Sequence, residues 1–173
     1  MRRTASFSRD GRYRYALGRE WGEGPTLTWV MLNPSTADHR RDDPTIRRCM
    51  AFSRAWGFGG LRVVNLFALR ATSPRALLDA SDPIGPRGSR VLRESLGSAE
   101  GVVAAWGNVH PRLVSRADAA RPLLPHGAWC LGTTRRGEPL HPLYVRGGTE
   151  PVMLATPMAG TLSVLRPPPT MAA

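Results

Sequence analysis

Lysine is missing from this sequence. All 24 basic residues among the 173 are arginines, and with 13 acidic residues they give a formal net charge of +11. Arginine suits phosphate because its planar guanidinium makes two parallel hydrogen bonds to the oxygens. A chain rich in Arg, Ala, Gly and Pro is also what GC-rich coding produces, so the missing lysine weakens the charge as evidence of function. From charge alone, two explanations of the excess of arginine are equally open: that the protein binds an anionic or nucleic-acid partner, or that the excess reflects only the composition of the coding sequence.

Cysteine and long apolar runs are scarce as well. Cys49 and Cys130 lie far apart in the chain, without the close spacing of a zinc or redox pair, so we expect reduced thiols in a reducing compartment. Neither end carries an apolar run long enough to span a membrane. The sequence also lacks a Walker loop, a dinucleotide glycine fingerprint and a Gly-x-Ser-x-Gly elbow. We therefore expect a cytoplasmic protein without a membrane partner or an obligate protein partner.

The balance of residues is that of a globular protein, with 42% hydrophobic and 21% charged residues. The length suits one domain, which we predict over residues 1–165, followed by a flexible proline-rich tail over 166–173. Short apolar runs predict central strands over 26–32, 61–67, 102–106 and 128–131, and an N-terminal edge strand over 12–17. Helices are predicted over 44–56, 74–80, 86–96 and 111–121.

This alternation of strands and helices predicts an α/β fold. We expect a three-layer α/β/α domain with a central, mostly parallel four-stranded sheet plus the N-terminal edge strand. In such a sheet the ligand lies beyond the carboxyl ends of the strands. Polar residues follow each of the four central strands, over 33–43, 65–73, 106–110 and 133–144. The sequence therefore predicts that these four loops converge on one polar site.

Asn65 and His141 are two main candidates for that site. Asn65 stands in an otherwise apolar strand, where a buried amide needs partners. We expect it to face a ligand, the alternative being an amide that satisfies backbone groups. Prolines at 139 and 142 stiffen the loop of His141, which suits catalysis or stabilisation of an anion. The alternative is a histidine that bonds a carbonyl group and packs on Leu143.

Three aspartates follow the first central strand. Asp43 precedes Pro44 and is predicted to cap the helix. Asp38 and Asp42 could activate a water molecule or hold a divalent ion, and we favour Asp38 as a general base. Neither aspartate stands in the register of a calcium loop, and no cysteine or histidine set completes a zinc site. We therefore expect no metal and no cofactor.

Other polar and aromatic residues in the same loops complete the predicted site. Asn33, Pro34 and Ser35 form either a simple turn after the strand or part of the site. Arg70, like Arg47, Arg48 and Arg75, could bind phosphate near the mouth, although solvated arginines are the common alternative. The predicted substrate contacts are Asn65, Phe67, Pro34, Ser35, Arg70, Trp106, Asn108 and Tyr144.

The chain closely resembles an uncharacterised bacterial family, the domain of unknown function 1643. Most of residues 13–145 carry the resemblance. Its signatures are Leu32–Asp38, Asp42–Cys49, Asn65–Thr72, Asp82–Pro86, Ala104–Gly107 and His141–Tyr144. One departure lies at Arg87, Gly88 and Ser89, where an acid-amide pair is expected.

The order of these motifs also resembles the uracil-DNA glycosylase superfamily. The shared features are a proline-containing loop after the first strand, an Asn at the end of the second, an apolar-Trp-Gly third strand and a late His-Pro loop. The resemblance implies that Asp38 or Asn33 activates water and stabilises the sugar cation. It further implies that Asn65 reads the base edge and that His141 stabilises the departing base anion. Leu143 departs from the serine that commonly follows His-Pro there.

These features lead to three hypotheses for function. The first is a glycosylase-like hydrolase that cleaves an N-glycosidic bond in a nucleobase-containing substrate, which would be a nucleic acid, a nucleoside or a nucleotide. The second is a module on the same fold that binds a nucleotide or nucleic acid without catalysis. The third is a hydrolase that tailors a small metabolite, with Asp38 and His141 as base and acid.

Overall fold

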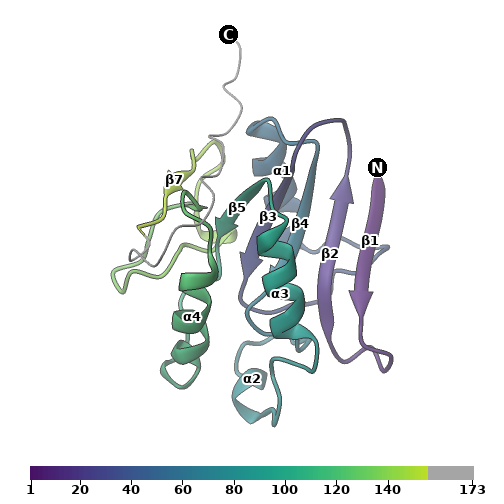
Figure 1. Cartoon of the computed structure of the whole chain (residues 1–173), viewed down its shortest axis with the longest axis vertical. Coiled ribbons are helices and arrows are strands. Elements are labelled where there is room, and N and C mark those ends of the chain that lie inside the picture. The colour runs from purple at the N-terminus through teal and green to yellow at the C-terminus, as the bar shows by residue number, and fades with distance from the viewer. Residues whose placement is uncertain (156–173) are drawn as a thin grey trace.

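A mixed seven-stranded sheet runs through the molecule, as the computed structural model of residues 1–155 shows (Figure 1). Its strands lie in the order β1-β2-β4-β3-β5-β6-β7. The four central strands β4, β3, β5 and β6 run parallel, and β1, β2 and β7 pair antiparallel with their neighbours. The bounds are β1 Arg2–Phe7, β2 Arg14–Glu20, β3 Thr26–Met31, β4 Gly60–Asn65, β5 Gly101–Ala104, β6 Trp129–Cys130 and β7 Val152–Met153. The tail predicted over 166–173 lies outside the described residues.

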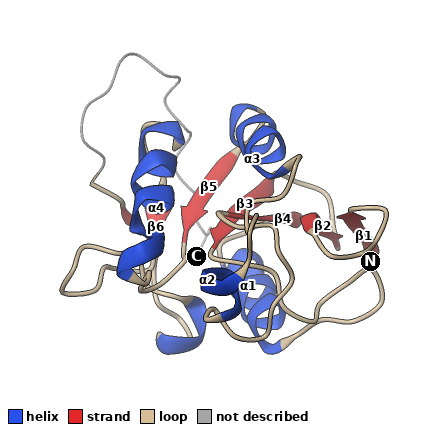
Figure 2. Ribbon diagram, turned by 90° about the horizontal axis from the view of Figure 1, so that it is seen from below, coloured by secondary structure: helices blue, strands red, loops and turns tan. Residues whose placement is uncertain are grey.

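Helices cover both faces of this sheet, with α1 and α3 on opposite sides (Figure 2). The α-helices are α1 Pro44–Ala55, α2 Ala76–Asp79, α3 Gly88–Gly97 and α4 Val114–Ala120. There are also short 3-10 helices, which are η1 Pro111–Leu113, η2 Arg121–Leu123 and η3 Pro142–Tyr144. Within residues 1–155, no helix has the length and apolar character needed to cross a membrane. With helices on both faces of a sheet, the molecule has the α/β architecture that the sequence predicts.

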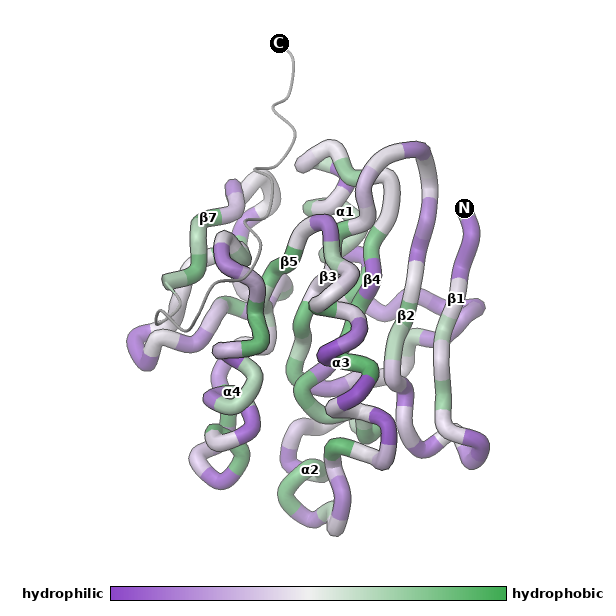
Figure 3. Tube along the Cα trace, in the orientation of Figure 1, coloured by the Kyte–Doolittle hydropathy of each residue, from purple (hydrophilic) through white to green (hydrophobic). Residues whose placement is uncertain are grey.

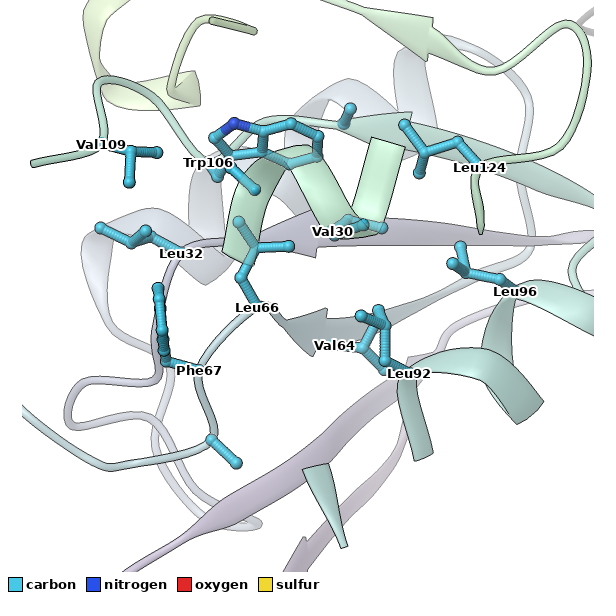
Figure 4. Packing of buried hydrophobic residues seen from close by; sticks show 14 of the residues in the cluster. Val30, Leu32, Val64, Leu66, Phe67, Leu92, Leu96, Trp106, Val109 and Leu124 are labelled. Atoms are coloured by element: carbon cyan, nitrogen blue, oxygen red, sulfur yellow. The ribbon is translucent and has the colours of Figure 1, made fainter. Parts of the chain in front are cut away.

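Two hydrophobic clusters separate the faces of the sheet, because successive strand residues point to opposite sides. Trp29 and Val63 pack with α1, whereas Val30 and Val64 pack with α3 and α4. The cluster on the side of α3 and α4 also contains Leu66, Leu92 and Trp106 (Figure 4). Hydrophobic residues are frequent along β5, while the start of β1 is hydrophilic (Figure 3). The parallel strands are therefore buried on both faces.

The start of α1 forms as the sequence predicts. The carboxylate Oδ1 of Asp43 accepts a hydrogen bond from the backbone N–H of Ile46 at 2.9 Å, and Pro44 takes the first helical position. Proline fits there because its missing N–H would have no partner inside the helix. This helix begins directly after the loop that leaves β3, so its amino terminus lies at the carboxyl edge of the sheet.

The sheet is wider than the sequence predicts. The predicted edge strand over 12–17 is β2, which lies inside the sheet between β1 and β4. The true edge is β1, whose six residues are only partly buried or exposed, so they carry little apolar alternation. The strand β7 is missing from the prediction because it has only two residues, both exposed. The second predicted helix also begins later, at Ala76, and the hydroxyl of Ser73 accepts from the N–H of Arg75 before the helix starts.

Candidate functional site

A cavity of about 600 Å³ lies at the carboxyl ends of the parallel strands, and all four polar loops contribute to it. In Figure 1 the arrowhead of β3 points toward this end of the molecule, where α2 lies. The geometry follows from topology, because β4, β3 and β5 are parallel neighbours whose loops leave the same edge. Seven predicted site residues line the cavity, and they are Asn33, Ser35, Asn65, Trp106, Asn108, His141 and Tyr144.

Asn65 forms part of the cavity wall at the end of β4. It pairs with Met31 of β3 and follows Leu61 and Val63 on the side of the sheet that faces α1. Asn65 is 5% exposed, and neither its Oδ1 nor its Nδ2 has a hydrogen-bond partner among the described residues. Buried amides are normally paired, since leaving them unpaired is costly. A donor and an acceptor are thus held ready at the wall of the cavity.

His141 lines the cavity from the loop before η3. Its Nδ1 accepts a hydrogen bond from the backbone N–H of Leu143 at 3.3 Å. The neutral ring then carries its proton on Nε2, which can donate to a ligand. Burial lowers the pKa of His141, and the charge of Asp43 opposes this effect. The structure therefore favours a neutral imidazole that acts as a hydrogen-bond donor.

The backbone at the end of β5 fixes where His141 lies. Gly107 has a φ of +74°, and a Cβ built there would come within 3.1 Å of the Cβ of His141. The N–H of Gly107 donates to the carbonyl oxygen of Pro139 at 2.8 Å, which ties the two loops together. The Trp-Gly pair after the third central strand thus allows the close approach of the late loop.

His110 shows that the local motif alone does not define the site. It also precedes a proline and a 3-10 turn, and its Nδ1 accepts from the N–H of Arg112 at 3.2 Å. His110 is exposed and is not part of the cavity lining. The two histidines share a capping role, and only His141 adds a position inside the cavity.

Arg48 of α1 holds the loop of His141 in place. Its Nη2 donates to the carbonyl oxygen of Val145 at 2.6 Å, and its Nε donates to that of Pro142 at 3.3 Å. The guanidinium also lies over the ring of Phe52, 4.9 Å from the centroid. A phosphate contact was one possible role for Arg48 from the sequence, but these bonds commit it to the protein backbone.

Trp106 supplies an apolar wall because its polar atom is used inside the protein. The Nε1 donates to Oε2 of the buried Glu138 at 2.6 Å, and Arg121 donates to the same oxygen at 2.8 Å. Tyr144 lies at the mouth, 83% exposed, with its ring 5.6 Å from that of His141. The cavity therefore combines an indole wall with an exposed aromatic at its entrance.

Asn33 is oriented by its own loop. Its Nδ2 donates to the carbonyl oxygens of Ala71 and Pro34 at 2.9 and 3.1 Å. No described residue donates to the Oδ1 of Asn33, which leaves this oxygen as an acceptor. Asp43 lines the cavity as well, although the sequence predicts only its role as helix cap.

Asp38 lies outside the cavity lining, in contrast to its predicted place. Its Oδ1 accepts from the backbone N–H groups of Arg40 and Arg41 at 2.6 and 2.8 Å. These bonds lower the pKa of Asp38, so its carboxylate is stabilised as a turn-forming group. Asp42 is used structurally too, because it pairs with the buried Arg19 at 2.8 Å.

Three further predicted contacts lie away from the cavity lining. Phe67 is 2% exposed and packs in the cluster on the opposite face from α1. The strand ends at Asn65, so the alternation that would place Phe67 beside it does not continue. Pro34 is buried, and its carbonyl accepts from the N–H of Ala71. Arg70 is exposed and donates to the carbonyl oxygen of Gly11 at 3.1 Å.

Arg14 is the main lining residue that the sequence does not predict. It is 2% exposed, and its Nη1 donates to the carbonyl oxygen of Ala37 at 2.7 Å. Burial lowers the pKa of Arg14 to about 10. The sequence contains one signal for the position of Arg14. Tyr13 and Tyr15 face the side of α3, so the alternation of strand residues places Arg14 on the side of α1. Threonines 45, 72 and 134 also contribute to the lining without having been singled out.

Acidic, histidine and cysteine side chains do not form a metal site in residues 1–155, where no three of them gather closely enough to hold an ion. Both cysteines are buried and free. Burial raises the pKa of Cys130 and of Cys49. Their thiols are thus protonated groups of the core rather than nucleophiles.

Comparison with known proteins identifies one family. A family model described as "Protein of unknown function (DUF1643)" matches residues 14–143. No curated protein and no solved structure matches the chain. The matched segment contains the first three loops of the cavity and the fourth as far as Leu143, so Asn33, Asn65 and His141 lie inside it and Tyr144 follows it directly.

Proposed function

The chain belongs to the DUF1643 family of proteins of unknown function, and we propose that it hydrolyses the N-glycosidic bond of a nucleobase-containing substrate in its cavity. The substrate class covers nucleic acids, nucleosides and nucleotides. The single observation that carries the proposal is the buried amide of Asn65, whose Oδ1 and Nδ2 lack partners in the described part of the chain. The edge of a nucleobase presents a donor and an acceptor side by side, which is the complement of this amide.

The remaining walls suit a planar, partly polar ligand. Trp106 and Met31 line the cavity as apolar groups. The Nε2–H of His141 provides a further donor, and the Oδ1 of Asn33 provides an acceptor. A pocket with apolar walls and few fixed polar groups is typical of small-molecule sites.

The same groups support a reaction. Breaking the glycosidic bond leaves positive charge on the sugar and its electron pair on the base nitrogen. A carboxylate and a preorganised donor on opposite sides both favour this transition state. A water molecule held by Asn33 would attack the anomeric carbon and pass a proton to Asp43. The neutral His141 would donate a hydrogen bond to the base anion, which then takes its proton from solvent.

The architecture also supports this proposal. The mixed sheet has helices on both faces and polar loops at the carboxyl edge of its parallel strands, which is where ligands bind in open α/β sheets. The roles given to the loop residues come from the resemblance of the motifs to the uracil-DNA glycosylase superfamily. The resemblance gives the role of the carboxylate that activates water to Asp38, but Asp38 lies outside the cavity lining, whereas Asp43 is part of it. We therefore assign the carboxylate role to Asp43.

Release of free base is the measurement that tests the proposal. Purified protein is incubated with DNA that contains uracil, hypoxanthine or mismatches, and with a panel of nucleosides and nucleotides, and the free base is quantified by chromatography. The variants Asn65→Ala and His141→Asn should lower the rate by about 100-fold or more, the effect of losing one transition-state donor. Asparagine keeps the capping acceptor of His141 and removes the Nε2 donor.

His110→Asn is the matched control, because His110 has the same capping geometry outside the cavity. This control should keep the wild-type rate. If the wild-type protein released base from no member of the panel, hydrolysis would be ruled out for these substrates.

A binding module without catalysis is the second candidate, and the contacts of Asp43 favour it. Both carboxylate oxygens already accept backbone N–H groups, from Ile46 at 2.9 Å and from Ala37 at 3.4 Å. Oxygens that already accept backbone hydrogen bonds have fewer free lone pairs to take a proton from water. Under this alternative, a nucleotide raises the melting temperature of the protein without turnover, since a ligand that binds only the folded state stabilises it.

A further inference from the structure

Buried arginines of this protein differ in how their charge is matched. Arg19 is 0% exposed, and its Nε pairs with Oδ1 of Asp42 at 2.8 Å. Arg121 is mostly buried and pairs with Oε2 of Glu138 at 2.8 Å. Arg14 is equally buried, but no carboxylate among the described residues forms an ion pair with it. A buried charge without a close counter-charge is costly.

The contacts of Arg14 leave much of its guanidinium unused. Nη1 donates to the carbonyl oxygen of Ala37, while Nε is buried and has no partner in residues 1–155. Nη2 makes no hydrogen bond within the same residues. Because Arg14 lines the cavity, a ligand bound there can supply the missing acceptor.

Asp43, the carboxylate with the largest electrostatic effect on Arg14, is already engaged elsewhere. Asp43 attracts Arg14, but its two oxygens accept from the N–H groups of Ile46 and Ala37. The backbone of Ala37 thus bonds to both side chains, with its N–H donating to Asp43 and its carbonyl oxygen accepting from Arg14. Ser35, Thr45 and Thr72 also line the cavity, and their hydroxyl groups are further potential donors for a ligand.

We propose that Arg14 is the phosphate-binding residue of this cavity, so that the ligand is a phosphorylated nucleoside rather than a free nucleoside. This inference rests on the nucleobase-binding part of the proposed function and adds an anionic subsite to it. An arginine with two unused donor nitrogens matches the oxygens of a phosphate group. The phosphate would supply the counter-charge that Asp42 and Glu138 supply to Arg19 and Arg121.

Binding titrations of three kinds of probe test the subsite. Isothermal titration calorimetry compares nucleosides, their 5′-monophosphates and inorganic phosphate on the wild-type protein. We expect the monophosphate of the preferred base to bind about 10- to 100-fold more tightly than the nucleoside, the range for a charge-assisted hydrogen bond. A short single-stranded oligonucleotide with the same base is a further arm. It binds as tightly as the monophosphate if the phosphate comes from nucleic acid, and less tightly if the ligand is a free nucleotide.

Variants then assign the effect to Arg14. Arg14→Gln should remove the advantage of the monophosphate and leave the affinity for the nucleoside within about threefold, while Arg14→Lys should keep part of the advantage because it keeps the charge. Arg116→Gln is the matched control. Arg116 is also partly buried with an unpartnered Nη2, and its pKa is also lowered by burial, but it does not line the cavity.

The outcomes separate this inference from the proposed function. Equal affinity of the wild-type protein for nucleoside and monophosphate would overturn the phosphate subsite and leave nucleobase binding intact. Binding of inorganic phosphate that Arg14→Gln abolishes, with no binding of any nucleoside, would support the subsite and contradict nucleobase recognition. The wild-type comparison needs no variant, so it decides the question even if Arg14→Gln does not fold.

Discussion

The side chain of Asn65 connects stability with ligand binding, because its amide is buried and both of its polar atoms lack partners. Asn65→Leu replaces the amide with an apolar group of similar size. We expect the free energy of unfolding to rise by about 1 kcal/mol, since burying an unpaired polar group costs about 1–3 kcal/mol in proteins. Nucleobase affinity should be lost at the same time. Urea denaturation and calorimetric titration measure the two effects.

Asn108→Leu is the control for this residue, because Asn108 lines the same cavity and is exposed. Its stability should change by no more than about 0.5 kcal/mol. A clear loss of stability in Asn65→Leu would contradict the expectation and indicate that the amide has a structural partner.

Single residues differ in how well the sequence identifies them. Asn65 and His141 can be predicted because an amide in an apolar run and a histidine between prolines are unusual in themselves. Arg14 is one of 24 arginines, and only the packing of β2 against the loop after β3 buries it. Asp38 and Asp43 are five residues apart, and the turn at Arg40 and Arg41 decides which carboxylate lies in the cavity. Such choices depend on tertiary structure.

At the start of helix α1, the cap residue Asp43 serves both the fold and the site. The carboxylate of Asp43 caps the helix and also lines the cavity. Asparagine caps a helix as well as aspartate does, whereas alanine does not. We therefore expect Asp43→Asn to change the free energy of unfolding by no more than about 0.5 kcal/mol, and Asp43→Ala to lower it by about 1 kcal/mol. Both variants should release base slowly, because neither has the carboxylate.

Chemical denaturation and the base-release assay, applied to the same two variants, separate capping from chemistry. Full activity of Asp43→Asn would show that the carboxylate charge has no part in the reaction. Reduced stability of that variant, equal to the loss in Asp43→Ala, would instead show that the charge itself stabilises the amino terminus of α1.

The elements that can be predicted from the sequence are those with strong local signals. The Asp43-Pro44 pair marks the start of α1, and the buried parallel strands are continuous apolar runs. The strands β1 and β7 are exposed or partly exposed, so burial leaves no pattern in them. Their places at the two ends of the sheet follow from backbone pairing with β2 and β6, which the sequence of either strand alone does not reveal.

Across the whole molecule, Arg19 couples the antiparallel strands to the loop that carries Asn33 and Asp43. Besides its ion pair with Asp42, Arg19 donates to the carbonyl oxygens of Gly18 at 2.7 Å, of Thr4 in β1 and of Asp38 in the loop. Arg3 of β1 reaches the same Asp42 at 3.0 Å. The edge of the sheet and one wall of the cavity thus depend on one buried network.

Replacing Arg19 by methionine tests this coupling, with Arg2→Met as the control from the same pair of strands. Arg19→Met leaves Asp42 with only the partly exposed Arg3, so we expect the free energy of unfolding to fall by about 3 kcal/mol. Arg2 pairs with Glu20 on the surface, where its side chain is 72% exposed, and its loss should cost less than about 0.5 kcal/mol. Urea denaturation measures both. If the two variants were equally stable, the strands β1 and β2 would be independent of the loop at the site.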